Sequence, residues 1–392
     1  IFLDLQTVGA ITSSELTANQ AQNGGGLYSV NATATVSDTL FSANQATQHG
    51  GGAVFAQRSG GEVQFSTFEN NVAVTGHGGA VVTQDASGTP LRNNVFRNNR
   101  TQAPTAIGGA VKVFSSATSP ITNNLFEGNQ SVDGGGLVVQ AASISVTGNT
   151  FRANVATRYG GGMVANQGAQ LIVSQNLCAG IRALLDAGAL SIQYSSGGDI
   201  TRNTFTGNQA SMNNGNSGAI KVYNLSNPTI SQNLIENNQA KDGGGIYVEL
   251  LSAPIITENI IRLNHSGEYG GGISVTSSSR PIIRDNTIAN NLSDLNGGGV
   301  FANDRANVIL ERNTISDNDA SALGGGLVLL SASGTLRGNS VRYNQAGTHG
   351  GGLVLNASDP TMQNNVISRN VAAQLGGGIL VQAGSTPTML NN

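Results

Sequence analysis

Two carboxylates carry the clearest chemical possibility in the sequence. Glu258 and Asp285 lie at the same place in neighbouring copies of a repeated segment, each directly before an asparagine. If these copies stack as strands of one sheet, the two side chains lie roughly 4.8 Å apart, which is one strand spacing. A close carboxylate pair can act as acid and nucleophile on a glycosidic bond, or can hold a calcium ion. Arg202 and Arg312 fall in the same row, which favours instead a solvated surface row neutralised by arginine.

The remaining residues of chemical interest favour structural roles. The histidines show neither a zinc-ligand spacing nor a Ser/His/Asp arrangement. The one cysteine, Cys178, falls where an inward apolar residue belongs, so we expect a buried thiol. Asp133, Asp186 and Asp242 each precede a glycine phrase and are interpreted as turn formers. We therefore predict no catalytic residue and no cofactor, with the two carboxylates above as the alternative catalytic or calcium-binding pair.

A four-residue phrase places these residues in a repeat. Gly-Gly-(Gly or Ala)-(Leu, Ile, Val or Met) returns every 26 or 27 residues, with two intervals of 30. A fixed period of this size is typical of a solenoid, in which each repeat buries its apolar face against its neighbours. The copies begin at Gly24, Gly51, Gly78, Gly108, Gly134, Gly160, Gly243, Gly270, Gly297, Gly324, Gly350 and Gly376, with weaker copies at Ala187 and Ser217.

Each repeat contains three short apolar segments. The first alternates with the period of a strand, as in residues 137–140. The second often opens with proline, as in residues 254–256, and the third is Asn-x-(Phe or Ile)-x-x-Asn, as in residues 149–154. Short strands without a helical crossover predict coils of a parallel β-helix. We predict an all-β, right-handed, single-stranded parallel β-helix of about 14 coils, with three short strands per coil and one elongated domain over residues 1–392.

Two sets of asparagines recur at fixed places in the third segment. One set lies two residues before the Phe or Ile, as at Asn259 and Asn286, and we expect its amides to stack in register. The second set lies three residues after the Phe or Ile, as at Asn264 and Asn291. We expect this second set to take the left-handed conformation of a sharp corner.

The composition limits the partners. Charged residues make up 10% of the chain and the net charge is -3, which favours neither nucleic acid nor an anionic membrane. No apolar run reaches the ~20 residues of a membrane-spanning segment. The chain starts at Ile1 without Met and reaches Asn392 in mid-coil. We expect either a longer natural chain, for instance one that has lost a signal peptide, or rods that stack end to end.

The paired motifs resemble those of a known family. The Gly-Gly-Ala-Val phrases at Gly51 and Gly78, with the Phe-x-x-Asn motifs at Phe41 and Phe68, resemble motifs of the chlamydial polymorphic membrane proteins. The passenger regions of those proteins are surface-exposed adhesins. The chain also resembles the wider group of right-handed parallel β-helix repeat proteins, which includes pectate lyases and other polysaccharide-cleaving enzymes. These resemblances imply an extracellular or cell-surface location, with further copies of the chain, cell-surface proteins or glycans as partners.

The outward face of the first strand in each repeat gives the main candidate for a contact surface. Its first outward position is mostly apolar where water is expected, and its next is mostly amide. Such a stripe favours contact with another rod, a protein or sugar rings, and is also typical of ordinary strand propensity. The candidate ligand or assembly stripe comprises Tyr28, Phe55, Val138, Val164, Tyr247, Phe301, Val328, Val354 and Leu380.

The connections between the segments are short. Only those that end at Gly108 and Ser217 reach 9 residues, and we expect no loop that walls a pocket. In the irregular stretch 176–200, residues 181–185 are predicted to form a short helical bulge. The sequence therefore predicts a non-enzymatic, extracellular or cell-surface rod for adhesion or fibre assembly. The alternative is a polysaccharide lyase or glycoside hydrolase of the same fold that uses Glu258 and Asp285.

Overall fold

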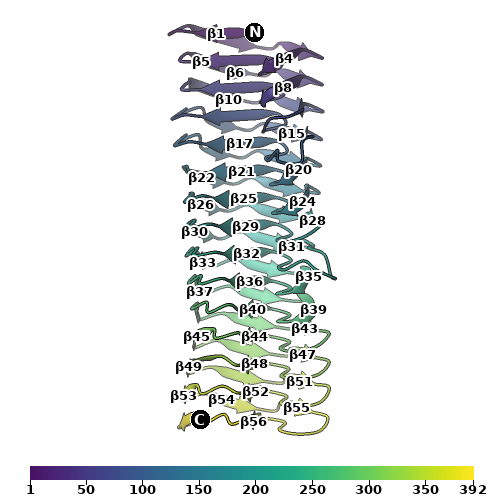
Figure 1. Ribbon diagram of the computed structural model, residues 1–392, viewed down its shortest axis with the longest axis vertical. Helices are drawn as coiled ribbons and strands as arrows, with labels where there is room; N and C mark the ends of the chain where they lie inside the picture. The colour runs from purple at the N-terminus through teal and green to yellow at the C-terminus, as the bar shows by residue number, and fades with distance from the viewer. The chain divides into compact units, whose positions relative to one another are not determined.

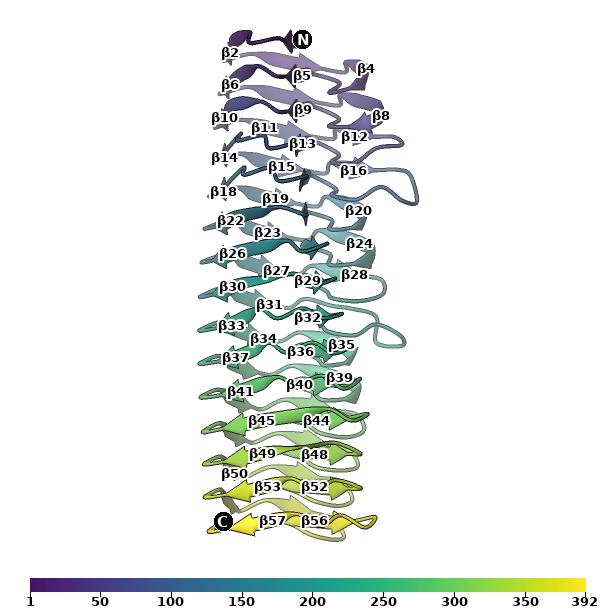
Figure 2. The ribbon, with the colours of Figure 1, turned by 60° about the vertical axis from the view of Figure 1, so that its left-hand side comes forward.

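The computed structural model describes residues 1–392 as short β-strands joined by turns, without a helix. Accordingly, no helix that could span a membrane is present. The strands wind into a right-handed parallel β-solenoid of about 14 turns, which confirms the predicted fold class. Within its parts, equivalent strands of consecutive coils lie one above the other (Figures 1 and 2).

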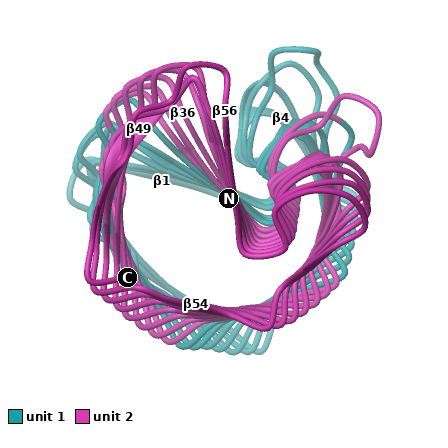
Figure 3. Ribbon diagram, turned by 90° about the horizontal axis from the view of Figure 1, so that it is seen from below, with its two compact units in different colours: residues 1–184, 189–191, 196–198 teal, residues 185–188, 192–195, 199–392 magenta.

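The chain forms two compact units. Unit 1 comprises residues 1–184, 189–191 and 196–198, and unit 2 comprises residues 185–188, 192–195 and 199–392 (Figure 3). Both units are built from the same coil, which passes in turn through sheets that we call A, B, C and D. Sheets A, B and C hold the three predicted strands, whereas the fourth strand was not predicted.

Sheets A and D border the candidate site, and their neighbouring strands pair in parallel. In unit 1, sheet A contains β1 (Phe2–Asp4), β5 (Leu27–Val30), β9 (Val54–Gln57), β13 (Val81–Gln84), β17 (Val111–Phe114), β21 (Leu137–Gln140) and β25 (Met163–Asn166). In unit 2 it contains β32 (Ile220–Tyr223), β36 (Ile246–Glu249), β40 (Ile273–Val275), β44 (Val300–Asn303), β48 (Leu327–Leu330), β52 (Leu353–Asn356) and β56 (Ile379–Gln382). In unit 1, sheet D contains β4 (Gln20–Asn23), β8 (Gln45–Gly50), β12 (Val72–Ala73), β16 (Arg100–Thr101), β20 (Gln130–Asp133), β24 (Val155–Tyr159) and β28 (Arg182–Ala183). In unit 2 it contains β35 (Gln239–Asp242), β39 (His265–Tyr269), β43 (Leu292–Ser293), β47 (Asp319–Ala320), β51 (Gln345–Ala346) and β55 (Val371–Ala372).

Sheets B and C complete each coil. In unit 1, sheet B contains β2 (Val8–Thr12), β6 (Thr33–Ser37), β10 (Gly60–Gln64), β14 (Leu91–Arg92), β18 (Ile121–Thr122), β22 (Ser143–Thr147) and β26 (Gln170–Ser174). In unit 2 it contains β33 (Thr229–Ser231), β37 (Ile255–Thr257), β41 (Ile282–Arg284), β45 (Asn307–Glu311), β49 (Ser333–Arg337), β53 (Thr361–Gln363) and β57 (Thr388–Leu390). In unit 1, sheet C contains β3 (Glu15–Thr17), β7 (Leu40–Ser42), β11 (Thr67–Glu69), β15 (Val95–Arg97), β19 (Leu125–Glu127), β23 (Thr150–Arg152) and β27 (Leu177–Ala179). In unit 2 it contains β31 (Thr204–Thr206), β34 (Leu234–Glu236), β38 (Ile260–Arg262), β42 (Thr287–Ala289), β46 (Thr314–Ser316), β50 (Ser340–Arg342) and β54 (Val366–Ser368). Two further strands, β29 (Leu190–Gln193) and β30 (Gly197–Thr201), contain residues of both units.

Two asparagine ladders hold successive coils in register, of which the one through Asn259 and Asn286 was predicted. The Asn264 backbone N–H and Nδ2 both donate to Oδ1 of Asn291, at 3.1 and 3.0 Å. The other ladder repeats this pattern, with Asn259 donating to Oδ1 of Asn286 at 2.9 and 3.0 Å. Each buried amide thereby satisfies backbone groups that the corners would otherwise leave unpaired.

The left-handed conformation belongs to the residue before each corner asparagine. Leu263, with φ 56°, precedes Asn264, and Asn290, with φ 55°, precedes Asn291. The expectation that the asparagine itself is left-handed is therefore wrong. The residue before it makes the corner and points into solvent, which leaves the asparagine amide directed into the coil.

Phenylalanines fill one column of the core in unit 1. Neighbouring rings are stacked, with centroids 4.5 to 4.9 Å apart. Such pairs contribute about 0.5–1.5 kcal/mol each beyond the burial of their surface. The column comprises Phe41, Phe68, Phe96, Phe126 and Phe151.

The glycine phrase makes a tight corner in each coil. Gly51 has φ 64°, in the left-handed region that favours glycine. A Cβ atom on Gly52 would lie 2.1 Å from the carbonyl oxygen of Gly79 in the next coil. The second glycine is therefore required by the close stacking of successive coils.

The irregular stretch 176–200 contains no helix. Residues 182–183 form β28 and residues 184–185 are bends, so the helical bulge predicted for residues 181–185 is wrong. Ile181 and Ala183 are buried while Arg182 is exposed, which is the alternation of a strand. Cys178 is fully buried, as predicted.

Candidate functional site

The predicted contact stripe is buried. Apart from the half-buried Tyr28 and Leu380, its members are less than a tenth exposed. In each unit the chain turns sharply inward between sheet D and sheet A, so that the outer face of sheet A packs against the preceding segment (Figure 3). The expectation that water covers this row is therefore wrong, and most of the stripe offers almost no surface to a partner.

A column of residues covers this face. We call it the pre-glycine column, because each member directly precedes a glycine phrase. Within each unit, bridges align most neighbouring members, whereas the side chains of His77 and Asp186 accept a hydrogen bond from the N–H of the next member. In unit 2, Tyr269 and Leu323 pack against the buried cluster of Phe301, Val328 and Val354. The column comprises His77, Ile107, Asp133, Tyr159, Asp186, Asn216, Asp242, Tyr269, Asn296, Leu323, His349 and Leu375.

Two lysines interrupt the buried row, Lys112 in β17 and Lys221 in β32. Nζ of Lys221 lies 2.7 Å from Oδ2 of Asp186 and 3.1 Å from Oε2 of Glu249. The same Nζ lies 5.1 Å from the ring centroid of Tyr223. The Lys221 side chain is only 6% exposed. Because a buried ammonium is tolerated when carboxylates compensate it, the two carboxylates account for the burial of this lysine.

Electrostatics fix the charge of Lys221. Burial alone would lower its pKa, but the charges of Asp186 and Glu249 together raise the pKa of Lys221 above its usual value. Burial, and then the charge of Glu249, raises the pKa of the Tyr247 phenol in the same cluster. A proton donor or acceptor needs a pKa near the working pH. Lys221 is therefore a fixed cation, and the cluster is suited to electrostatic rather than acid–base work.

Asp242 is the member of the pre-glycine column in unit 2 whose carboxyl pKa is shifted by burial. Burial raises the pKa of its carboxyl to about 6, with Lys241 opposing and Glu268 assisting the rise. Nζ of Lys241 lies 3.6 Å from Oδ2 of Asp242 and 3.1 Å from Oε2 of Glu268. Oδ1 of Asp242 is buried without a hydrogen-bond partner. The charge of this carboxyl therefore changes close to neutral pH.

The predicted carboxylate pair is exposed, and each member has another partner. Asp285 accepts two hydrogen bonds of 2.8 Å from Arg312, and these hold the pKa of the Asp285 carboxyl below its usual value. Oε2 of Glu258 accepts a hydrogen bond of 2.8 Å from Nε2 of Gln232. The chain has no group of three or more His, Cys, Asp and Glu placed to hold a metal ion. Catalysis or calcium binding by Glu258 and Asp285 stays a prediction.

Sequence reasoning missed the two lysine sites. The outward row was described only as mostly apolar, so Lys112 and Lys221 within it were given no role, and Asp186 was interpreted as a turn former. One signal was available, because the two lysines follow the two longest connections, which end at Gly108 and Ser217. These connections project from the side of their units (Figure 2).

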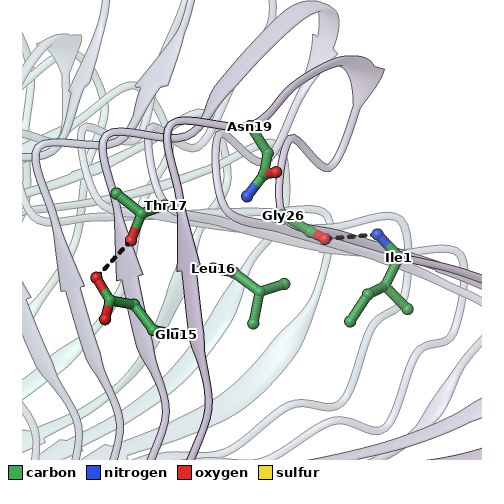
Figure 4. A pocket seen from close by; sticks show the side chains of 6 residues that line it. All are labelled: Ile1, Glu15, Leu16, Thr17, Asn19 and Gly26. Atoms are coloured by element: carbon green, nitrogen blue, oxygen red, sulfur yellow. Dashed lines mark hydrogen bonds between the residues drawn. The ribbon is translucent and has the colours of Figure 1, made fainter.

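A hollow lies beside the first coil of unit 1 (Figure 4). Its one carboxylate, Glu15, accepts a hydrogen bond of 3.0 Å from Thr17, and the amine of Ile1 donates to the Gly26 carbonyl at 2.9 Å. These polar groups satisfy one another and do not converge on a common point. The hollow is lined by Ile1, Glu15, Leu16, Thr17, Asn19 and Gly26.

Comparisons with known proteins agree on the fold. A family model described as a right handed beta helix region matches residues 1–151, 135–292 and 269–392. No curated protein matches the sequence. The comparisons do not specifically support the resemblance to the chlamydial polymorphic membrane proteins, which stays a prediction.

Three solved structures are distantly similar. The A-module of the mannuronan C-5 epimerase AlgE6 of Azotobacter vinelandii is 12% identical over 93% of this chain and 91% of its own, with a TM-score of 0.38. The periplasmic alginate epimerase AlgG is 12% identical over 93% of this chain and 77% of its own, with a TM-score of 0.37. The Streptococcus pneumoniae surface protein and adhesin PfbA is 13% identical over 94% of this chain and 91% of its own, with a TM-score of 0.35. At these values the likeness concerns the fold alone.

Proposed function

Since the chain belongs to the right-handed β-helix family, we propose that it is an extracellular or cell-surface binding scaffold, not an enzyme, which presents one corner of its coils to a protein partner. The observation that carries the proposal is a group of exposed apolar side chains in unit 2. We call this group the apolar corner, and it consists of Tyr194, Leu225, Leu250 and Leu251.

The apolar corner follows the sheet A strands of consecutive coils. Its members are 45%, 50%, 36% and 54% exposed, in chain order. The Leu225 N–H donates to the Leu250 carbonyl at 3.0 Å, so the leucines of two coils lie side by side. The Tyr194 ring meets the ring of Tyr223 edge-on, with centroids 5.6 Å apart. A contiguous exposed apolar group on a soluble protein marks an interaction surface.

The chemistry of the apolar corner favours a protein over a glycan. A sugar ring binds through an aromatic face together with polar groups that bond its hydroxyls. Three of the four members are leucines, which offer neither. Aliphatic and tyrosine side chains together match the apolar centre of a protein–protein contact.

The charged side chains outside this corner support a structural use. In unit 1, Glu127 bridges two neighbouring coils through Arg97 at 3.0 Å and Arg152 at 2.7 Å. In unit 2, Asp285 pairs with Arg312 of the next coil at 2.8 Å. The alternative function, a polysaccharide-cleaving enzyme, requires Glu258 and Asp285 to leave their present partners before they act on a substrate.

A double variant tests the proposal. Leu225→Ser with Leu251→Ser should remove the contact, whereas Leu263→Ser should not. Leu263 is a matched control because it is also a left-handed corner residue and is 50% exposed, but it lies at a different corner. Sedimentation velocity would measure self-association, and binding to intact and protease-treated cells would measure a cell-surface protein partner.

We expect wild type and the Leu263→Ser control to self-associate or to bind untreated cells. The double variant should bind at least tenfold more weakly than wild type. Equal behaviour of all three proteins would contradict it. Turnover of a glycan that is abolished by Glu258→Gln with Asp285→Asn would favour the enzyme instead.

A further inference from the structure

Lys112 and Lys221 occupy the same place in their coils, but their surroundings differ in charge. Each is the first outward residue of its sheet A strand, and each follows one of the two longest connections. In unit 2, Asp186 precedes Lys221 by 35 residues, and in unit 1 the residue at the same spacing before Lys112 is His77. One of the two carboxylates around Lys221, that of Asp186, therefore has the imidazole of His77 as its counterpart in unit 1.

The second counterpart follows from the strand register. In unit 2, Glu249 lies opposite Tyr223 in the next strand, and in unit 1 Gln140 lies opposite Phe114 in the same way. Gln140 donates from Nε2 to Oε1 of Gln167 at 2.7 Å, so its amide is directed to the following coil. Neither residue that replaces a carboxylate supplies a negative charge.

Lys112 is buried without a counter-ion. The residue is 4% exposed and lies between Val82 and Val138 of the neighbouring strands. Its Nζ lies 4.5 Å from the ring centroid of Phe114. The acid of the pre-glycine column in the next coil, Asp133, is occupied by two hydrogen bonds from Arg158, at 2.9 and 2.6 Å. A buried charge without its partner is destabilising, so the site is incomplete as it stands.

His77 places a second donor beside this ammonium. The Ile107 N–H donates to Nδ1 of His77 at 3.2 Å, which leaves the proton of the neutral ring on Nε2. Burial, and then the charge of Lys112, lowers the pKa of His77 to about 4, while burial lowers the pKa of Lys112 to about 8. At neutral pH the pair is therefore a neutral imidazole next to a mostly protonated amine. Nε2 of His77 and Nζ of Lys112 each keep access to solvent or to a hydrogen-bond partner.

We propose that Lys112 and His77 form a binding site for an external organic carboxylate, one oxygen of which accepts from Nζ and the other from Nε2–H. The bound anion takes the place that Asp186 and Glu249 fill around Lys221. Phe114 supplies the apolar wall of the site. The inference is independent of the apolar corner, which lies in the other unit.

Lysine-specific NMR tests the site, because the chain has only three lysines, Lys112, Lys221 and Lys241. The protein would be labelled with ¹³C-lysine and titrated with sodium acetate, the probe, at constant ionic strength. The Lys112 Cε signal should shift to saturation and its pKa should rise by about one unit, because a bound opposite charge favours the protonated amine. The Lys241 signal is the internal control for non-specific salt effects and should not move.

Two variants and two salts complete the test. Lys112→Met should remove one lysine signal and so assign it to Lys112, while keeping the fold, since methionine suits the apolar row. His77→Gln keeps that signal and should weaken acetate binding about tenfold. An unchanged Lys112 signal up to about 50 mM acetate, well above a millimolar Kd, would overturn the proposal. So would an equal shift with sodium chloride, a parallel shift of Lys241, or tighter binding of inorganic phosphate than of acetate.

Discussion

Replacing Asn291 by alanine should cost about 3 kcal/mol of unfolding free energy, because this amide links three coils of unit 2. Its Oδ1 accepts from the backbone N–H and from Nδ2 of Asn264, at 3.1 and 3.0 Å. Its Nδ2 donates to the carbonyl of Ile261 and to Oδ1 of Asn318, both at 3.0 Å. The residue is 1% exposed, so water does not replace these bonds.

The magnitude follows from what the truncation leaves behind. The buried N–H of Asn264 loses its acceptor, which costs about 2 kcal/mol, and the loss of the remaining bonds adds about 1 kcal/mol. Oδ1 of Asn318 keeps its bond from the Asn291 backbone N–H, at 3.0 Å, so this group is not orphaned.

Asn290 is the matched control. It is the same residue type in the adjacent position, but it is exposed and has φ 55°, which glycine adopts without strain. Asn290→Gly should therefore change stability by no more than about 0.5 kcal/mol. Urea unfolding followed by circular dichroism, with calorimetry as the test of cooperativity, measures both variants. The reasoning is refuted if Asn291→Ala and Asn290→Gly are equally stable.

Three further changes have outcomes set by the same structure. Gly52→Ala should prevent folding or cost more than about 4 kcal/mol of unfolding free energy, because the new Cβ meets the backbone of Gly79. Gly88→Ala should be tolerated, because its Cβ would meet nothing closer than 3.6 Å. Equal urea midpoints of the two variants would contradict this. The pKa of the Asp242 carboxyl is about 6 in the folded protein and 3.8 when the carboxyl is free, so between these two pH values the folded state holds the proton more tightly than the unfolded state. The unfolding free energy should therefore fall by up to about 3 kcal/mol as the pH rises from 3.8 to about 6. Asp242→Asn should remove that part of the pH dependence, and superimposable profiles of urea midpoint against pH for wild type and variant would refute it. Cys178 is buried with a raised thiol pKa, so a thiol reagent should react with it only after denaturation; rapid reaction of the native protein would count against this.

The coil and its ladders were predictable because their signals recur at fixed spacing. The stacking of Asn259 over Asn286 follows directly from the period, since equivalent residues of adjacent coils must meet. The conformation of the corner was not predictable in the same way. The general tolerance of asparagine for the left-handed region pointed to Asn291, whereas its inward hydrogen bonds leave that conformation to Asn290.

The candidate site was predictable only where it follows the rows of the sheet. The row of Glu258, Asp285 and Arg312 was identified from spacing, but the partner that each long side chain takes was not. The burial of the apolar row depends on the inward turn before each glycine phrase. The residues of this turn cover the apolar row, but their residue type varies from coil to coil. The pairing of Lys221 with Asp186 joins residues of two different coils, which a periodic pattern does not reveal.

The left-handed corner residue that precedes each ladder asparagine has a consequence for how this protein diversifies. Leu263, Asp317 and Tyr343 all occupy this place, with exposed side chains and φ angles of 56° to 58°. The left-handed conformation costs a non-glycine residue there up to about 1–2 kcal/mol, and costs asparagine and aspartate the least. Selection can thus exchange charge, ring or aliphatic chain at these corners, one coil at a time, without repacking the interior.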